Sequence, residues 1–307
     1  MGPHPVTVGM RLPQEVLDGG RDLLASAVTR IADVGLDHVV ITDHVSFYGG
    51  EGADALVHAT AITALHPTLS AHVSVYLLPL RHPVTVARQL ATIGQLAAGR
   101  LVFGVGIGGE DPHEVAVCGV DPHTRGARAN ESLEILRGLL AGDCVTFTGK
   151  HFQVEEARIL PPPCPAIPIV VGGRSDAALT RAGRFGDGWL GIWCSAGRFA
   201  SAIAAVEETA ATHGRSPRWQ HGLVVWCGVA GTAPAARALL GPRMEALYHM
   251  PFEPFERYSP TGPPEQVADF LRPYLEAGAT QLDLIPVGES IEATIDHAAA
   301  VRELLLD

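Results

Sequence analysis

The sequence has little charge, few aromatic residues and few cysteines. Charged residues make up 18% of the 307 residues and aromatic residues 6%, whereas hydrophobic residues make up 47%. This balance predicts a folded chain with a large core, because disordered chains combine low hydrophobicity with high net charge. No apolar run approaches the roughly 20 residues that a membrane-spanning helix needs. The first residues also lack the pattern of a signal peptide, so we expect a cytoplasmic protein without a membrane segment.

Metal and nucleic-acid sites have little support in the composition. The five cysteines are widely spaced and form no CxxC motif, so we expect reduced thiols and no structural zinc. The 14 histidines are scattered, and none forms an HxxxH pair with a glutamate at metal-binding spacing, so we predict no metal site. A net charge of −11 argues against nucleic acid or an anionic membrane as the main partner.

Strand and helix patterns alternate along the whole chain. Apolar runs predict strands at 6–10, 38–42, 70–77, 101–105, 167–171, 188–192, 223–229 and 281–285. Helical periodicity follows each of them. Such alternation requires parallel strands, and eight units predict a single α/β domain over 1–307, a (β/α)8 TIM barrel. An open doubly wound sheet is the competing topology.

Two segments interrupt the alternation and predict insertions after strand 4 and near strands 7 and 8. Residues 144–165 have turn chemistry between two alternating runs, which predicts a hairpin with a proline-rich exit. Residues 248–264 are aromatic and proline-rich, and we expect them to be irregular. Long loops of this kind are often lids or substrate walls, so we expect an apolar or aromatic pocket.

Polar residues and glycines gather where three predicted strands end. The strand at 38–42 ends at Asp43-His44, and a histidine there can exchange protons near neutral pH. The segment GRLVFGVGIGGEDPHE (99–114) passes from a buried strand into glycines and then acids. IPIVVGGRS (167–175) ends in glycine before a helix, where backbone N–H groups can bind phosphate. Together they predict one ligand over the carboxyl edge of the sheet.

Four long segments resemble the bacterial luciferase-like monooxygenase superfamily, and within it the deazaflavin-dependent oxidoreductases. They are GLDHVVITDHV (35–45), LPLRHPVTVARQLATIGQLAAGRLVFGVGIG (78–108), RGARANESLEILRGL (125–139) and PAIPIVVGGRSDAALTRAGRFGDGW (165–189). They cover much of the chain in the family's order. The resemblance implies a barrel that binds FMN or coenzyme F420, the 8-hydroxy-5-deazaflavin, at the carboxyl ends of its strands.

The resemblance also implies site residues. It places His44 and Glu110 as catalytic residues, although Asp111 or Glu114 could equally be the acid. It implies a bulge with a non-prolyl cis peptide at Ser74-Val75 that supports the cofactor ring. Cofactor-binding residues would be Asp43, Ser74, Val75, Gly106, Gly108, Gly172, Gly173 and Arg174. Arg125, Arg128 and Glu131 are expected to form ion pairs within the scaffold.

Three functions fit these residues. The first is an oxidoreductase that transfers a hydride between coenzyme F420 and a small organic substrate. The second is a two-component monooxygenase that uses O2 and reduced FMN from a separate reductase. The third is a non-catalytic barrel that binds a flavin. The family resemblance further implies a homodimer.

Overall fold

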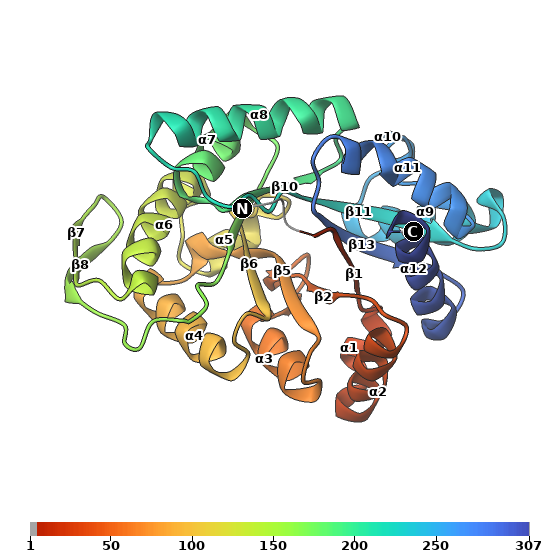
Figure 1. Cartoon of the computed structure of the whole chain (residues 1–307), viewed down its shortest axis with the longest axis horizontal. Coiled ribbons are helices and arrows are strands. Elements are labelled where there is room, and N and C mark those ends of the chain that lie inside the picture. The colour runs from red at the N-terminus through yellow and green to blue at the C-terminus, as the bar shows by residue number, and fades with distance from the viewer. Residues whose placement is uncertain (1–4, 307) are drawn as a thin grey trace. The chain divides into compact units, whose positions relative to one another are not determined.

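Parallel strands alternate with helices along residues 5–306, the part of the chain that the computed structural model describes (Figure 1). The barrel strands are β1 (Thr7–Arg11), β2 (His38–Ile41), β5 (Ser70–Leu77), β6 (Leu101–Gly106), β9 (Ile169–Gly172), β10 (Gly188–Ile192), β11 (Gly222–Val229) and β13 (Gln281–Val287). The strand order is β10-β9-β6-β5-β2-β1-β13-β11, and β10 also pairs with β11. This closed order confirms the predicted TIM-barrel class and not the open sheet.

Helices follow the strands as the periodicity predicts. The main helices are α2 (Gly20–Asp33), α3 (Ala55–Leu65), α4 (Pro83–Leu96), α6 (Arg125–Ala141), α7 (Asp176–Phe185), α8 (Ala196–Thr212), α9 (Ala233–Tyr248), α11 (Pro264–Glu276) and α12 (Ile291–Leu306). Shorter ones are α1 (Gln14–Asp18), α5 (Pro112–Val117) and α10 (Glu253–Glu256), with single 3-10 turns at Leu78–Leu80 and Pro122–Thr124. Proline in the first turn starts α4 and α11, where a missing N–H costs nothing.

The chain divides into two compact units, each made from separate segments. The first unit contains residues 1–40, 190–205 and 217–307, and the second contains residues 41–189 and 206–216. Strands β2 and β10 are divided between the units. The assignment of the whole chain to a single domain stays a prediction.

In the first unit, β13 pairs in parallel with β1 on one side and β11 on the other. β1 also pairs with β2, and β11 pairs with β10 and with the short β12 (Thr261–Gly262). Every residue of β11 is buried. A continuous apolar run of this kind is typical of a parallel strand that is covered on both faces.

In the second unit, β6 lies between β5 and β9, and all three strands run parallel. Figure 1 shows β5 beside β6. Along the chain, α3 precedes β5 and α4 follows it. All six residues of β6 are buried, including its glycines. The glycines and acidic residues at the carboxyl ends of these strands therefore lie at one edge of the unit's sheet.

The two predicted insertions are present. An antiparallel hairpin of β7 (Val145–Thr148) and β8 (Gln153–Ala157) confirms the prediction for 144–165. Residues 248–264 were expected to be irregular, but they contain α10 and β12, so that expectation is wrong in part. A second hairpin, β3 (His44–Phe47) with β4 (Glu51–Ala53), follows β2 and was not predicted.

Glu131 of α6 supports the β7–β8 hairpin through the backbone. Its carboxylate accepts N–H bonds from Lys150, His151 and Phe152 at 2.9–3.1 Å. The expected ion pairs are therefore wrong for this residue. Arg128 likewise donates to the carbonyl of Pro79 at 3.0 Å and covers the ring of Phe152.

Within residues 5–306, no helix has both the length and the hydropathy that crossing a bilayer requires.

His221, which directly precedes β11, makes the first unit sensitive to acid. Its side chain is 3% exposed and its ring stacks on Trp219 with centroids 5.0 Å apart. Burial lowers the pKa of His221 to about 4. The unfolded chain, with an ordinary pKa near 6.5, therefore binds one more proton than the folded chain between about pH 4 and 6.5.

We therefore expect the free energy of unfolding to fall by about 3 kcal/mol through His221 as the pH drops from about 6.5 to 4. Urea unfolding at several pH values measures the fall. The His221→Phe variant removes the proton-binding group and should show a flatter profile over this window. An identical profile in the variant would contradict the assignment.

Candidate active site

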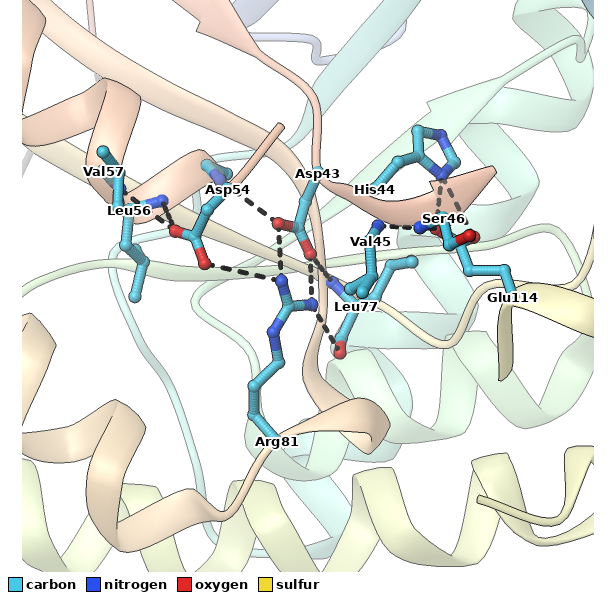
Figure 2. A network of polar contacts seen from close by, with 11 residues as sticks. Asp43, His44, Val45, Ser46, Asp54, Leu56, Val57, Leu77, Arg81 and Glu114 are labelled. Carbon is cyan, nitrogen blue, oxygen red and sulfur yellow. Dashed lines mark hydrogen bonds and ion pairs between the residues drawn. The ribbon is translucent and has the colours of Figure 1, made fainter. Parts of the chain in front are cut away.

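Asp43 anchors the carboxyl end of β2. Its side chain is fully buried and accepts backbone N–H bonds from Ala55 at 3.1 Å and Leu77 at 2.9 Å. Arg81 donates to both carboxylate oxygens, and it also lies 3.6 Å from Asp54 (Figure 2). Burial raises the pKa of Asp43, and the Arg81 guanidinium and the two backbone donors oppose that rise. Asp43 thus ties β2 to β5 and to the start of α3.

His44 is held by a carboxylate from a different part of the chain. Its Nδ1 lies 3.1 Å and 3.2 Å from the two oxygens of Glu114, which is 2% exposed. Glu114 also accepts the backbone N–H bonds of Val45 at 2.7 Å and Ser46 at 3.3 Å (Figure 2). A carboxylate only accepts, so Nδ1 of His44 carries a proton and Nε2 is the proton acceptor in the neutral ring. The His44 side chain is 28% exposed, which leaves it accessible to a ligand.

The three acids that follow β6 have different surroundings. Asp111 is 6% exposed, caps α5 through the N–H of His113 and accepts the N–H of Tyr48 at 2.9 Å. Glu110 is exposed, and its backbone carbonyl accepts from the Tyr48 hydroxyl at 2.9 Å. Of these acids, Glu114 is the one that the structure brings to His44. A catalytic role for Glu110 stays a prediction.

The bulge implied at Ser74-Val75 is present. The register of β5 against β6 runs from Ala71–Leu101 to Val73–Phe103 and resumes at Tyr76–Val105, so β5 has one extra residue. The Ser74–Val75 peptide bond is cis, which confirms the expected geometry. Its role as a support for a cofactor ring remains a prediction.

The glycines of β6 and β9 make room for this bulge. A Cβ on Gly106 would lie 2.3 Å from Cγ2 of Val75, and one on Gly172 would lie 2.9 Å from Cγ1 of the same residue. Val75 therefore occupies the space beside both glycines, so a ligand at this edge would meet the bulge. Cofactor binding by Gly106 and Gly172, which the family resemblance implies, stays a prediction.

Arg125 lies against the turn that follows β6. Gly108 and Gly109 have φ of +68° and +143°, a conformation that side chains rarely adopt. A Cβ on Gly109 would lie 2.9 Å from Nη1 of Arg125. Nε and Nη1 of Arg125 are buried and have no hydrogen-bond partner among the described residues, so the expected ion pair is wrong. Buried donors without an acceptor are rare, and an anion at the turn would satisfy them.

The turn from β9 to α7 has the features of a phosphate site. Ser175 caps α7 by accepting the N–H of Ala178 at 3.2 Å, and the helix then runs for ten residues. Gly173 has φ of +125°, and its carbonyl accepts from Nε1 of Trp189 at 2.7 Å. Arg174 is exposed at the same turn. The helix terminus and the nearby arginine favour an anionic ligand.

Sequence reasoning missed Arg81 and Arg125 as site residues. Arg81 lies two residues before Pro83, the first residue of α4, and nothing in this local pattern points to Asp43. Arg125 begins an arginine-rich helix and suggested only an ion pair within the scaffold. In each case the partner lies far away in the sequence, and no local pattern marks it.

A titratable histidine held by a buried carboxylate at the carboxyl end of a barrel strand is typical of an enzyme active site. Residues 7–259 match the family model described as luciferase-like monooxygenase. The chain therefore belongs to the luciferase-like monooxygenase family, a class of oxidoreductase enzymes.

Curated relatives include F420-dependent glucose-6-phosphate dehydrogenases. The one from Nocardia farcinica is 28% identical over 298 residues, which cover 86% of this chain and 87% of that protein. The one from Nakamurella multipartita is 32% identical over 62% of this chain and 57% of that protein. An uncharacterised Mycobacterium tuberculosis protein is 37% identical over 45% of this chain and 47% of that protein. The chain thus spans about half the length of several relatives.

Solved structures share the fold along almost the whole chain. An F420-dependent secondary alcohol dehydrogenase in complex with an F420-acetone adduct has a TM-score of 0.83 and 21% identity, covering 99% of this chain and 100% of that one. The monooxygenase RslO1 from Streptomyces bottropensis has a TM-score of 0.81 and 20% identity, covering 98% of each chain. These identities are low, so the likeness concerns the barrel itself.

Loss of Arg81 should destabilise the protein strongly. In the Arg81→Met variant the fully buried Asp43 carboxylate would lose its ion pair, which costs about 3–5 kcal/mol in comparable cases. Urea unfolding measures this free energy. The Asp43→Asn/Arg81→Met double variant should lose less unfolding free energy than the sum of the losses in the two single variants, because no unpaired charge remains.

The Arg30→Met variant is the control, because Arg30 pairs with Asp296 at the surface and about half of each side chain is exposed. We expect the free energy of unfolding of this variant to fall by less than about 1 kcal/mol. A similarly small loss in Arg81→Met would show that Arg81 does not stabilise the site.

Proposed function

We propose that this protein is an oxidoreductase that transfers a hydride between coenzyme F420 and a small organic substrate. The pairing of His44 with the buried Glu114, next to the anchored Asp43, is the observation that carries the proposal. F420-dependent dehydrogenases among the relatives and the structural neighbours support the choice of cofactor.

The residues of the second unit fit such a cofactor. The bulge at Ser74-Val75 offers a surface for a flat ring at the carboxyl end of β5. The turn at Gly172-Gly173 with the start of α7 suits a phosphate. The guanidinium group of Arg125, whose Nε and Nη1 have no hydrogen-bond partner among the described residues, adds positive charge next to Gly109. When bound, the deazaflavin supplies the hydride chemistry, while the protein orients it and exchanges protons.

His44 is the residue we propose for proton transfer to or from the substrate. Glu114 holds the proton on Nδ1, which leaves Nε2 to accept or return a proton. Glu114 also balances the positive charge that forms when His44 is protonated. Asp43 does not react in this scheme, since its carboxylate is occupied by Arg81 and two backbone donors.

A monooxygenase that uses reduced FMN is the second candidate, and the RslO1 monooxygenase among the structural neighbours favours it. A flat ring and a phosphate are common to both cofactors, so the same bulge and turn would serve FMN. A separate reductase partner would then be needed. The homodimer and the cytoplasmic location stay predictions, as does the absence of a metal site.

Cofactor binding decides between the two candidates. We expect anaerobic titration of the purified protein, followed by absorbance, to give a dissociation constant for F420 at least about tenfold lower than that for FMN, a preference of about 1.4 kcal/mol. Tighter binding of FMN, with oxygen consumed by the reduced complex, would favour the monooxygenase. Binding of neither would contradict both.

The His44→Gln variant tests the proposed proton transfer. With F420 and a panel of sugar phosphates and secondary alcohols, the variant should reduce F420 at least about 100-fold more slowly than the native enzyme. Its dissociation constant for F420 should change little, because the ring's support at Val75 is intact. The Glu114→Gln variant should slow turnover less than the His44→Gln variant does, because the histidine ring is still present.

The exposed His123 provides the matched control, because it lies on a surface turn with no part in the network. The His123→Gln variant should match the native enzyme in rate and in F420 binding. A native rate in the His44→Gln variant would contradict the proposed role of His44 in proton transfer. It would not bear on which cofactor the protein binds.

A further inference from the structure

A cavity in the first unit opens at the carboxyl ends of β1 and β13. Its volume is about 290 Å³. It is lined by the last residue of β1 and the residues that follow it, Trp226 of β11, Arg243 of α9, the end of β13 and the start of α12. Part of the wall is apolar, formed by Leu12, Trp226, Ile285, Val287 and Ile291. The carboxyl ends of barrel strands are where such enzymes bind ligands.

Arg11, the last residue of β1, lines this cavity and has a donor without a partner among the described residues. Its Nη2 donates to Oε1 of Gln14 at 3.1 Å, whereas its Nε is buried and has no partner among the described residues. A buried N–H without an acceptor lowers stability by about 1–3 kcal/mol. A ligand oxygen in the cavity would satisfy it.

The charges around Arg11 also favour an anionic ligand. Burial lowers the pKa of Arg11, and the positive charge of Arg243 on α9 lowers it further, whereas Tyr248 and Glu15 raise it. Arg11 still stays protonated, because an arginine side chain does not lose its proton in a protein. Arg243 lines the same cavity, is exposed, and forms no ion pair with a described residue. Glu15 and Glu289 also line the cavity, and both are exposed.

The start of α12 forms another wall. A Cβ on Gly288 would lie 2.5 Å from Oγ1 of Thr294, so glycine lets the end of β13 pass close to the helix. Ser290 caps the helix, which runs for 16 residues from Ile291. The positive end of its dipole therefore lies at the cavity together with the two guanidinium groups.

We propose that this cavity binds the acid group, a carboxylate or a phosphate, of a small organic anion whose apolar body packs against Trp226. The acid oxygens accept from Nε of Arg11 and attract Arg243. The apolar wall excludes water from the remainder of the ligand. This ligand class goes beyond the proposed function, and binding in this cavity does not require coenzyme F420.

Isothermal titration of the whole protein without cofactor tests the proposal. The ligands are 3-phenylpropionate, its neutral amide 3-phenylpropionamide, and phenyl phosphate. We expect the better of the two acids to bind at least about tenfold more tightly than the amide, since a charge-assisted bond is lost in the amide. The order of the two acids distinguishes a carboxylate site from a phosphate site.

Single-residue variants test whether the acid binds in this cavity. The Arg11→Met variant keeps the length of the side chain and should bind the preferred acid at least about tenfold more weakly. Arg243→Met should also weaken binding, and because Arg243 is exposed it keeps the test valid if Arg11→Met does not fold. Arg237→Met on the same helix is the control, because Arg237 pairs with Glu256 and does not line the cavity.

Equal affinities for the acids and the amide would overturn the proposal, as would no binding of any ligand. It is also overturned if Arg243→Met and a folded Arg11→Met bind the acid as well as the native protein does. None of these results would alter the F420 titration, so the two proposals can fail separately.

Discussion

The side chain of Val75 fills the space between β6 and β9 that a Cβ on Gly106 or on Gly172 would need. This close approach occurs at the extra residue of β5, where the register against β6 shifts between Val73 and Tyr76. Glycine at both positions is therefore a packing requirement of the bulge. The proposed cofactor site depends on the bulge, because we propose that the flat ring lies against Ser74 and Val75.

Asp43 and His44 are adjacent in the sequence and have opposite roles. Asp43 is buried and takes four hydrogen bonds, including two from Arg81, which fixes the end of β2 against β5. His44 is partly exposed and has a single carboxylate partner. Asp43 thus fixes the chain next to His44, the residue that we propose for proton transfer. A separate pair of arginines, Arg11 and Arg243, gives the first unit a charged cavity of its own.

Much of the fold was predictable from the sequence, because apolar runs with periods of two and 3.6 residues reflect burial directly. The barrel strands and the β7–β8 hairpin are local patterns of this kind. The pairing of Glu114 with His44 was not predictable, since it joins residues 70 positions apart and three acids follow β6. The packing of Val75 beside Gly106 and Gly172 is likewise a long-range contact that no local pattern encodes.

A crystal structure of the protein grown with oxidised coenzyme F420 under anaerobic conditions tests the central claim most directly. The account predicts electron density for the deazaflavin ring against Ser74 and Val75, with the phosphate at the turn that precedes α7. Density for the ring elsewhere, with the bulge in contact only with protein or solvent, would contradict it.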